Sequence, residues 1–166
     1  MLAVIKLATL NIDAITNRTR VGMLTEYSYI RRHDLVIVFL QEITDPELLP
    51  MPGYNVYYNI GSDICGTAIV TRNDIMLHNI NKSPSGRAIA AEYKGLCIVN
   101  IRVYAPLGTA KRMEREHFYN AEVPQLLQIG HGEIIIGGDF NCVLDPADTS
   151  GHFHTNRALT EMIRGL

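Results

Sequence analysis

The sequence predicts a layered α/β or α+β sandwich, because three kinds of pattern alternate along it. Short apolar runs rich in Val, Ile and Leu are bounded by turn residues, amphipathic helical patterns lie between some of these runs, and the middle of the chain carries several closely spaced turn signals. The chain has 166 residues, which suits a single domain. We therefore place no internal boundary within residues 1–166.

The apolar runs are short, as in strands that are buried on both faces of a sheet. We expect strands at residues 2–10, 35–40, 66–70, 96–104 and 134–136.

Helical spacing of apolar side chains predicts the helices. It favours helices over residues 18–32, with Asn17 as N-cap, and over residues 110–129, where Pro124 is expected to bend or split the helix. Residues 156–166 form a third amphipathic pattern. Between Tyr54 and Tyr93 there is no long helical pattern, and the turn signals there predict antiparallel hairpins.

Composition excludes several classes of protein. The chain is 47% hydrophobic and 19% charged, which argues against disorder. Its net charge of −2 does not favour binding of a polyanion by electrostatics alone. No segment is long enough to cross a bilayer, so no membrane partner is expected. The three cysteines include no Cys-x-x-Cys pair, which favours reduced thiols in an intracellular protein.

Several predicted strands end in polar side chains that bear useful chemistry. If neighbouring strands of one sheet point these ends the same way, the side chains converge on one rim, where open sheets commonly bind ligands. They are Asn11 and Asp13, Gln41 and Glu42, Tyr104, and Asp139 and Asn141.

Such a set suits metal-assisted chemistry on phosphate. Glu42 and Asp13 offer hard oxygen ligands that suit Mg²⁺ or Mn²⁺ rather than zinc. Asp139 would orient or deprotonate a water molecule, and the remaining side chains would donate hydrogen bonds to charge on phosphate. Those donors are Asn11, Asn141 and the Tyr104 hydroxyl.

Each of these residues also has a purely structural explanation when it is taken singly. Asn11 and Asp13 suit a strand-exit turn, and Asp139 with Asn141 suits an Asx turn. Glu42 suits a solvated strand end, and Tyr104 suits a core tyrosine with a bonded hydroxyl. The joint pattern over four strand ends favours a site.

The ordered motifs TLNID, FLQE, SGR, VYAP and GGDFN resemble those of the endonuclease/exonuclease/phosphatase superfamily. The segment from GGDFN to the C-terminus, and the run from GTAIVTR to YAPLGT, look most like the apurinic/apyrimidinic-type endonuclease domain of LINE-type non-LTR retrotransposons. The resemblance implies a DNase I-like four-layer sandwich, in which two mixed β-sheets are flanked by helices. It also implies Mg²⁺-dependent cleavage of a phosphodiester, with Mn²⁺ as a possible substitute.

The resemblance assigns a role to each matching residue. Glu42 matches the principal metal ligand and Asp13 a second acidic position near the metal. Arg87 matches an arginine beneath the active site, here expected to help bind substrate, although a charged residue entering a hairpin strand is the structural alternative. The catalytic positions of the family are matched by Asn11, Tyr104, Asp139 and Asn141.

One family motif has no match in this sequence. The family ends in a Ser-Asp-His motif that is absent here, so we expect the chain to lack a C-terminal part, including the last strands, and to leave a sheet edge exposed. His152 and His154 lie in a loop that relatives also have, and we do not assign either to the missing role. Their spacing is compatible with a metal site, but we expect solvated loop histidines instead.

Three functions remain open from the sequence. The preferred one is an endonuclease that nicks DNA for target-primed reverse transcription, located in the nucleus, with a reverse transcriptase domain as a possible partner in the same polyprotein. The second is a phosphatase or phosphodiesterase of the same fold that acts on a small phosphoester or phospholipid. The third is a catalytically inactive retroelement remnant that still binds metal or phosphate.

Overall fold

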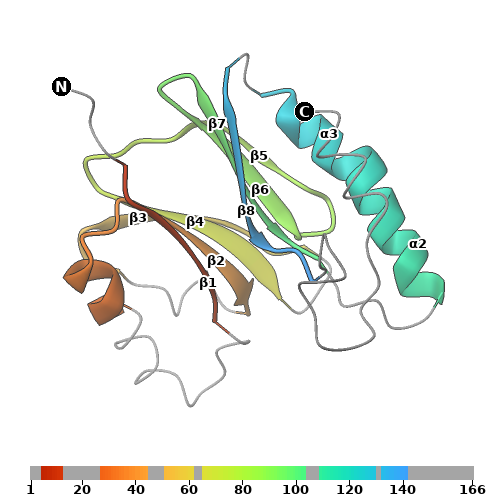
Figure 1. Ribbon diagram of the computed structural model, residues 1–166, viewed down its shortest axis with the longest axis horizontal. Helices are drawn as coiled ribbons and strands as arrows, with labels where there is room; N and C mark the ends of the chain where they lie inside the picture. Colours follow the sequence, from red (N-terminus) through yellow and green to blue (C-terminus); the bar gives the residue numbers. More distant parts are fainter. Residues whose placement is uncertain are drawn as a thin grey trace, which may run out of the picture.

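Two four-stranded sheets pack face to face in the computed structural model (Figure 1). The structure describes residues 5–12, 27–44, 51–61, 65–103, 109–129 and 132–141. Both sheets are mixed, because each combines antiparallel neighbours with one parallel pair. This is the layered α/β architecture that the sequence predicts, with two mixed sheets and helices outside them.

The first sheet has the strand order β1-β2-β4-β3. Its strands are β1 Leu7–Asn11, β2 Ile37–Ile43, β3 Tyr54–Asn59 and β4 Gly66–Arg72. β1 and β2 are parallel, and residues 27–32, which lie between them in sequence, are helical. Parallel neighbours require such a crossover, so this part of the chain is a βαβ unit.

The second sheet has the order β5-β6-β7-β8. Its strands are β5 His78–Lys82, β6 Ala88–Tyr93, β7 Leu96–Arg102 and β8 Ile134–Asp139. β7 and β8 are parallel, and the helices between them lie along the outer face of this sheet (Figure 1). Each sheet therefore contains one pair of parallel strands, and the carboxyl ends of such pairs are a common place for a binding site.

The helical segment after β7 is divided into three pieces. They are the α-helix α2 Thr109–His117, the π-helical turn η2 Phe118–Glu122 and the α-helix α3 Val123–Leu127. The Val123 N–H bonds the Phe118 carbonyl, five residues back, and Pro124 stands in the first turn of α3. Proline has no N–H to donate to the preceding turn, and the expected irregularity is present as a π-helical turn just before Pro124, through which the helical backbone continues.

Alternation of side chains produces three apolar layers. Phe39 and Ile69 of the first sheet pack with Ile89 and Ile98 of the second between the sheets. A second cluster packs the helical residue Ile30 on the outer face of the first sheet, and a third packs Phe118, Tyr119, Val123 and Leu126 on the outer face of the second.

The predicted strands are confirmed as elements, with differences at their ends. β2, β4 and β7 are buried on both faces as expected, but Ile134 and Ile135 of β8 are 36% and 40% exposed. The reason is that β8, like β1, is an edge strand of its sheet within the described residues. The expected hairpins are present in the antiparallel pairs β3–β4 and β5–β6.

In the part of the chain that the structure describes, no helix has the length and apolar character needed to span a bilayer.

Candidate active site

The ends of β1, β2 and β8 bring one carboxamide and two carboxylates into direct contact. The Asn11 amide nitrogen donates to Glu42 Oε1 at 3.1 Å and to Asp139 Oδ2 at 2.9 Å. Asn11 and Glu42 belong to the first sheet and Asp139 to the second. The convergence on one rim is confirmed for these residues, and the two expected sheets face each other so that each supplies part of the cluster.

Asp139 and Asn141 form a local turn that also shapes the cluster. The Asn141 backbone N–H donates to Asp139 Oδ1 at 3.0 Å, and its side-chain nitrogen donates to Asp139 Oδ2 at 3.1 Å. The Asn141 side chain also bonds the Val103 carbonyl, and its φ of 45° is a left-handed conformation that asparagine tolerates. The Asx turn is therefore part of the cluster formed by Asn11, Glu42 and Asp139. Three N–H groups, one from Asn11 and two from Asn141, donate to the Asp139 carboxylate.

The two glycines before Asp139 are required by packing and by backbone conformation. A Cβ on Gly137 would lie 2.8 Å from the Phe39 ring in the opposite sheet. Gly138 has a φ of +134°, and a Cβ there would lie 1.9 Å from the Ile101 carbonyl oxygen. Only glycine lets β8 approach both neighbours closely enough to present Asp139.

A β-bulge turns Glu42 toward the cluster. In a regular strand Gln41 and Glu42 would point to opposite faces. Here the β2–β4 register shifts between Gln41 and Ile43, and Glu42 has a φ of 62°. Gln41 thus faces the second sheet while Glu42 reaches Asn11, and Ile43 still joins the outer core.

A buried polar network supports the bulge from beneath. The Gln41 side chain donates to Asn100 Oδ1 at 2.7 Å and to Thr9 Oγ1 at 3.0 Å. Asn100, which is fully buried on β7, donates to the carbonyls of Leu40 and Ala68 at 2.9 and 2.7 Å. These bonds tie the two sheets together directly below Glu42.

Arg102 is a member of the site that our sequence analysis did not single out. Its Nη1 donates to the Cys65 carbonyl at 2.9 Å, and its Nε lies 3.9 Å from Glu42 Oε1. A signal was present: Arg102 follows Asn100 by two residues in a run that is otherwise apolar, so both side chains share the face of β7 that looks toward the first sheet.

Arg87 is buried immediately before β6. Its Nη2 lies 3.3 Å from Glu114 Oε2 on α2, and its backbone carbonyl accepts a bond from the Arg102 N–H at 2.7 Å. The residue as a whole is 5% exposed. Its role toward substrate stays a prediction.

The donor set suits a hard divalent cation. Asp13 and Tyr104, like His152 and His154, lie outside the described residues. Among the residues that are described, no group of three or more His, Cys, Asp and Glu side chains stands together, so Glu42 and Asp139 are the carboxylates available. Mg²⁺ is commonly held by one or two carboxylates with water completing its shell, and these residues therefore fit it.

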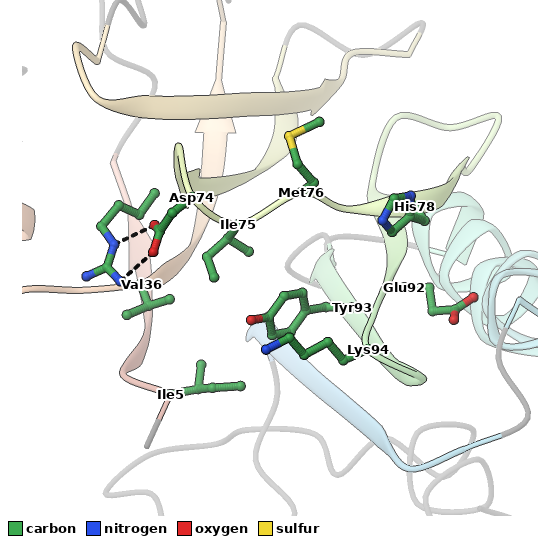
Figure 2. Close-up of a pocket in the computed structure, with 10 residues that line it drawn as sticks. Ile5, Val36, Asp74, Ile75, Met76, His78, Glu92, Tyr93 and Lys94 are labelled. Atoms are coloured by element: carbon green, nitrogen blue, oxygen red, sulfur yellow. Dashed lines mark hydrogen bonds and ion pairs between the residues drawn. The ribbon is translucent and has the colours of Figure 1, made fainter. Parts of the chain in front are cut away.

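A cavity of about 590 Å³ lies at the opposite end of the strands (Figure 2). It is lined by residues just before β1 and β2 and by residues at or just after the ends of β4 and β6, whereas the cluster lies where β1 and β2 end. Asp74 is engaged there by Arg72, through bonds of 2.6 and 2.9 Å, and the Lys94 amine lies over the Tyr93 ring. The convergent carboxylates and amides point to the Asn11 cluster, rather than to this cavity, as the candidate site.

The family model of the endonuclease/exonuclease/phosphatase family matches residues 8–158. The chain belongs to this family. No curated protein matches the sequence significantly. Several solved structures are similar in fold to this endonuclease/exonuclease/phosphatase domain over more than nine-tenths of its length.

An AP endonuclease from Archaeoglobus fulgidus superposes with a TM-score of 0.76 at 17% identity, over 97% of this chain and 69% of its own. The 3′ phosphatase NExo from Neisseria, bound to a product DNA hairpin, has a TM-score of 0.76 at 20% identity, over 98% and 70%. TDP2 from Caenorhabditis elegans follows with 0.61 at 18% identity, over 92% and 50%. At these identities the similarity establishes the fold, and the family membership identifies the chain as a member of a group of nucleases and phosphatases.

Proposed function

We propose that this chain is a Mg²⁺-dependent phosphodiester hydrolase that nicks DNA. The observation that carries the proposal is the joining of Glu42, Asn11 and Asp139 by hydrogen bonds of 3.1 and 2.9 Å at the ends of strands from two sheets. The NExo structure, with its product DNA hairpin, supports DNA as the substrate class.

The roles of the residues follow from their chemistry. Glu42 would hold the cation, with Asp13 as a second acidic ligand, and Mn²⁺ is expected to replace Mg²⁺. A bound Mg²⁺ supplies Lewis acidity toward phosphate and neutralises developing negative charge.

The second sheet would supply the water-activating part. The Asp139 carboxylate, held by three N–H groups, is fixed in position to accept a proton from an attacking water molecule. The Asn141 and Asn11 amides carry N–H groups that suit phosphate oxygens, and Tyr104 would add a hydroxyl. Water would attack phosphorus, the P–O3′ bond would break, the phosphate would stay on the 5′ side, and the leaving 3′ oxygen would take up a proton.

We further propose a retrotransposon-type endonuclease that leaves a 3′-hydroxyl to prime reverse transcription. The segments GGDFNCVLDP and VYAPLGT support this by their resemblance to LINE-type domains. A nuclear location and a reverse transcriptase partner belong to the same proposal. Extension of the nicked strand by an added polymerase would test it, because only a free 3′-hydroxyl can be extended.

Nicking of supercoiled plasmid in Mg²⁺ tests the hydrolase. Wild type is expected to produce open circles, and Glu42→Gln to reduce the rate by about 10²-fold or more, since it removes a ligand charge. Glu92→Gln is the matched control, because Glu92 borders the opposite cavity and bonds Asn79. Equal rates for wild type and Glu42→Gln would remove the metal-ligand assignment.

A small phosphoester is the second candidate substrate, favoured by the net charge of −2. Turnover of a soluble phosphate ester or a phospholipid headgroup without plasmid nicking would support it. Binding of Mn²⁺ with no turnover of any phosphoester would support the third candidate, an inactive retroelement remnant.

A further inference from the structure

Arg102 places a positive charge directly behind the predicted metal ligand. It is the last residue of β7, its side chain is 10% exposed, and its Nε lies 3.9 Å from Glu42 Oε1. Its register partner across the parallel ladder is Asp139. The positively charged guanidinium therefore lies next to the carboxylate that is proposed to bind a divalent cation.

The fold explains why an arginine is tolerated at this depth. A buried guanidinium is costly unless an anion and hydrogen-bond acceptors are near. The Cys65 carbonyl accepts from Nη1 at 2.9 Å, and the carboxylate of Glu42 is the anion. Asn100, two residues earlier, holds the same face of β7 against the first sheet.

Glu42 does not depend on Arg102 alone for its position. Its Oε1 also accepts the Asn11 amide at 3.1 Å, and the β-bulge sets its direction. Removal of the Arg102 charge therefore leaves the carboxylate in place and changes mainly the electrostatic potential around it.

We propose that Arg102 acts as the counter-charge of Glu42 and weakens the affinity of the site for a divalent cation. The inference rests on the proposed metal-dependent function. A fixed positive charge a few ångströms from the ligand repels an incoming Mg²⁺ and offsets part of the attraction of the two carboxylates. Its consequence is a site that loads and releases the cation readily.

Direct measurement of Mn²⁺ binding tests this without reference to turnover. Free Mn²⁺ is followed by electron paramagnetic resonance for wild type, Arg102→Gln, Arg102→Met and Arg102→Lys. Both neutral variants are expected to bind Mn²⁺ about three- to tenfold more tightly, and Arg102→Lys to stay within about twofold of wild type because it keeps the charge.

Arg72→Met is the matched control. It removes the same charge from the opposite end of the strands, where Arg72 is engaged by Asp74 and Asp34, and should change the affinity by less than about twofold. Glu42→Gln establishes whether the Mn²⁺ counted is bound at this site.

The outcomes separate this inference from the proposed function. Neutral variants that melt like wild type but bind Mn²⁺ no more tightly would overturn the inference. That result would mean that Arg102 only bonds the Cys65 carbonyl and that its charge does not affect the affinity for the cation. Failure of both neutral variants to fold would overturn the inference too, because Arg102 would then be required for the stability of the fold. If wild type binds no Mn²⁺, or Glu42→Gln binds equally well, the proposed metal site itself fails.

Discussion

Asn11 and Asp139 are joined by a 2.9 Å hydrogen bond although 128 residues separate them in the chain. The bond connects the end of a strand in one sheet with the end of a strand in the other. Asn11 also reaches Glu42, so one carboxamide sets the spacing of two carboxylates that would otherwise repel each other.

Replacement of Asn11 should impair chemistry far more than stability. We expect Asn11→Ala to lower the plasmid-nicking rate at saturating Mg²⁺ by about 10²-fold, because both carboxylates lose their shared donor. Asn11 is exposed, so thermal unfolding should change little. Asn55→Ala removes an amide that bonds Ile75 at a distance from the site and serves as control. A loss of rate smaller than about threefold would contradict the positioning role.

Gly138 should not tolerate a side chain. An alanine Cβ there would lie 1.9 Å from the Ile101 carbonyl oxygen, at a φ of +134°. We expect Gly138→Ala to lower the free energy of unfolding by about 3 kcal/mol or more, measured by urea titration. Gly95→Ala is the control, because Gly95 also has a positive φ but has open space around it, and it should cost about 1 kcal/mol. Similar losses for the two variants would show that φ, rather than the contact, limits residue 138.

Asn100 should be among the most sensitive polar residues of the core. Asn100→Ala leaves the Leu40 and Ala68 carbonyls without their described side-chain donor and deprives Gln41 of its acceptor. The expected loss is about 3 kcal/mol in the free energy of unfolding. Nicking should fall as well, since Glu42 follows Gln41 on the bulge. An unfolding curve that superposes on that of wild type would contradict the network.

Asp74 should contribute to the pH dependence of stability. Its bond from Arg72 holds the pKa of the Asp74 carboxyl below its usual range. A lowered folded-state pKa stabilises the protein above the unfolded pKa of about 4 and loses that effect as the pH falls through the folded pKa. The difference in melting temperature between wild type and Asp74→Asn should therefore be largest near pH 6 and shrink below about pH 4. An offset that stays constant over this range would contradict the assignment.

Local patterns were sufficient for the elements and for most of the side chains that meet in the candidate site. Apolar runs predicted β2, β4 and β7 because burial between layers requires continuous hydrophobic segments. Pro124 predicted the irregularity in the helix because the missing N–H is a property of the residue. Asn11, Glu42, Asp139 and Asn141 were found because each ends an apolar run with a side chain suited to metal or phosphate chemistry.

The remaining features depend on partners that are distant in sequence. The left-handed φ of Glu42 arises from the irregular pairing of β2 with β4, and no local signal distinguishes it from a regular strand. The division of the polar rim between two sheets and the position of Arg102 behind Glu42 depend on how the sheets pack. Amino-acid order thus set the chemistry available at each strand end, through local propensity and periodicity. The packing of one sheet on the other set which ends meet, because contacts between residues so far apart form only when the layers come together.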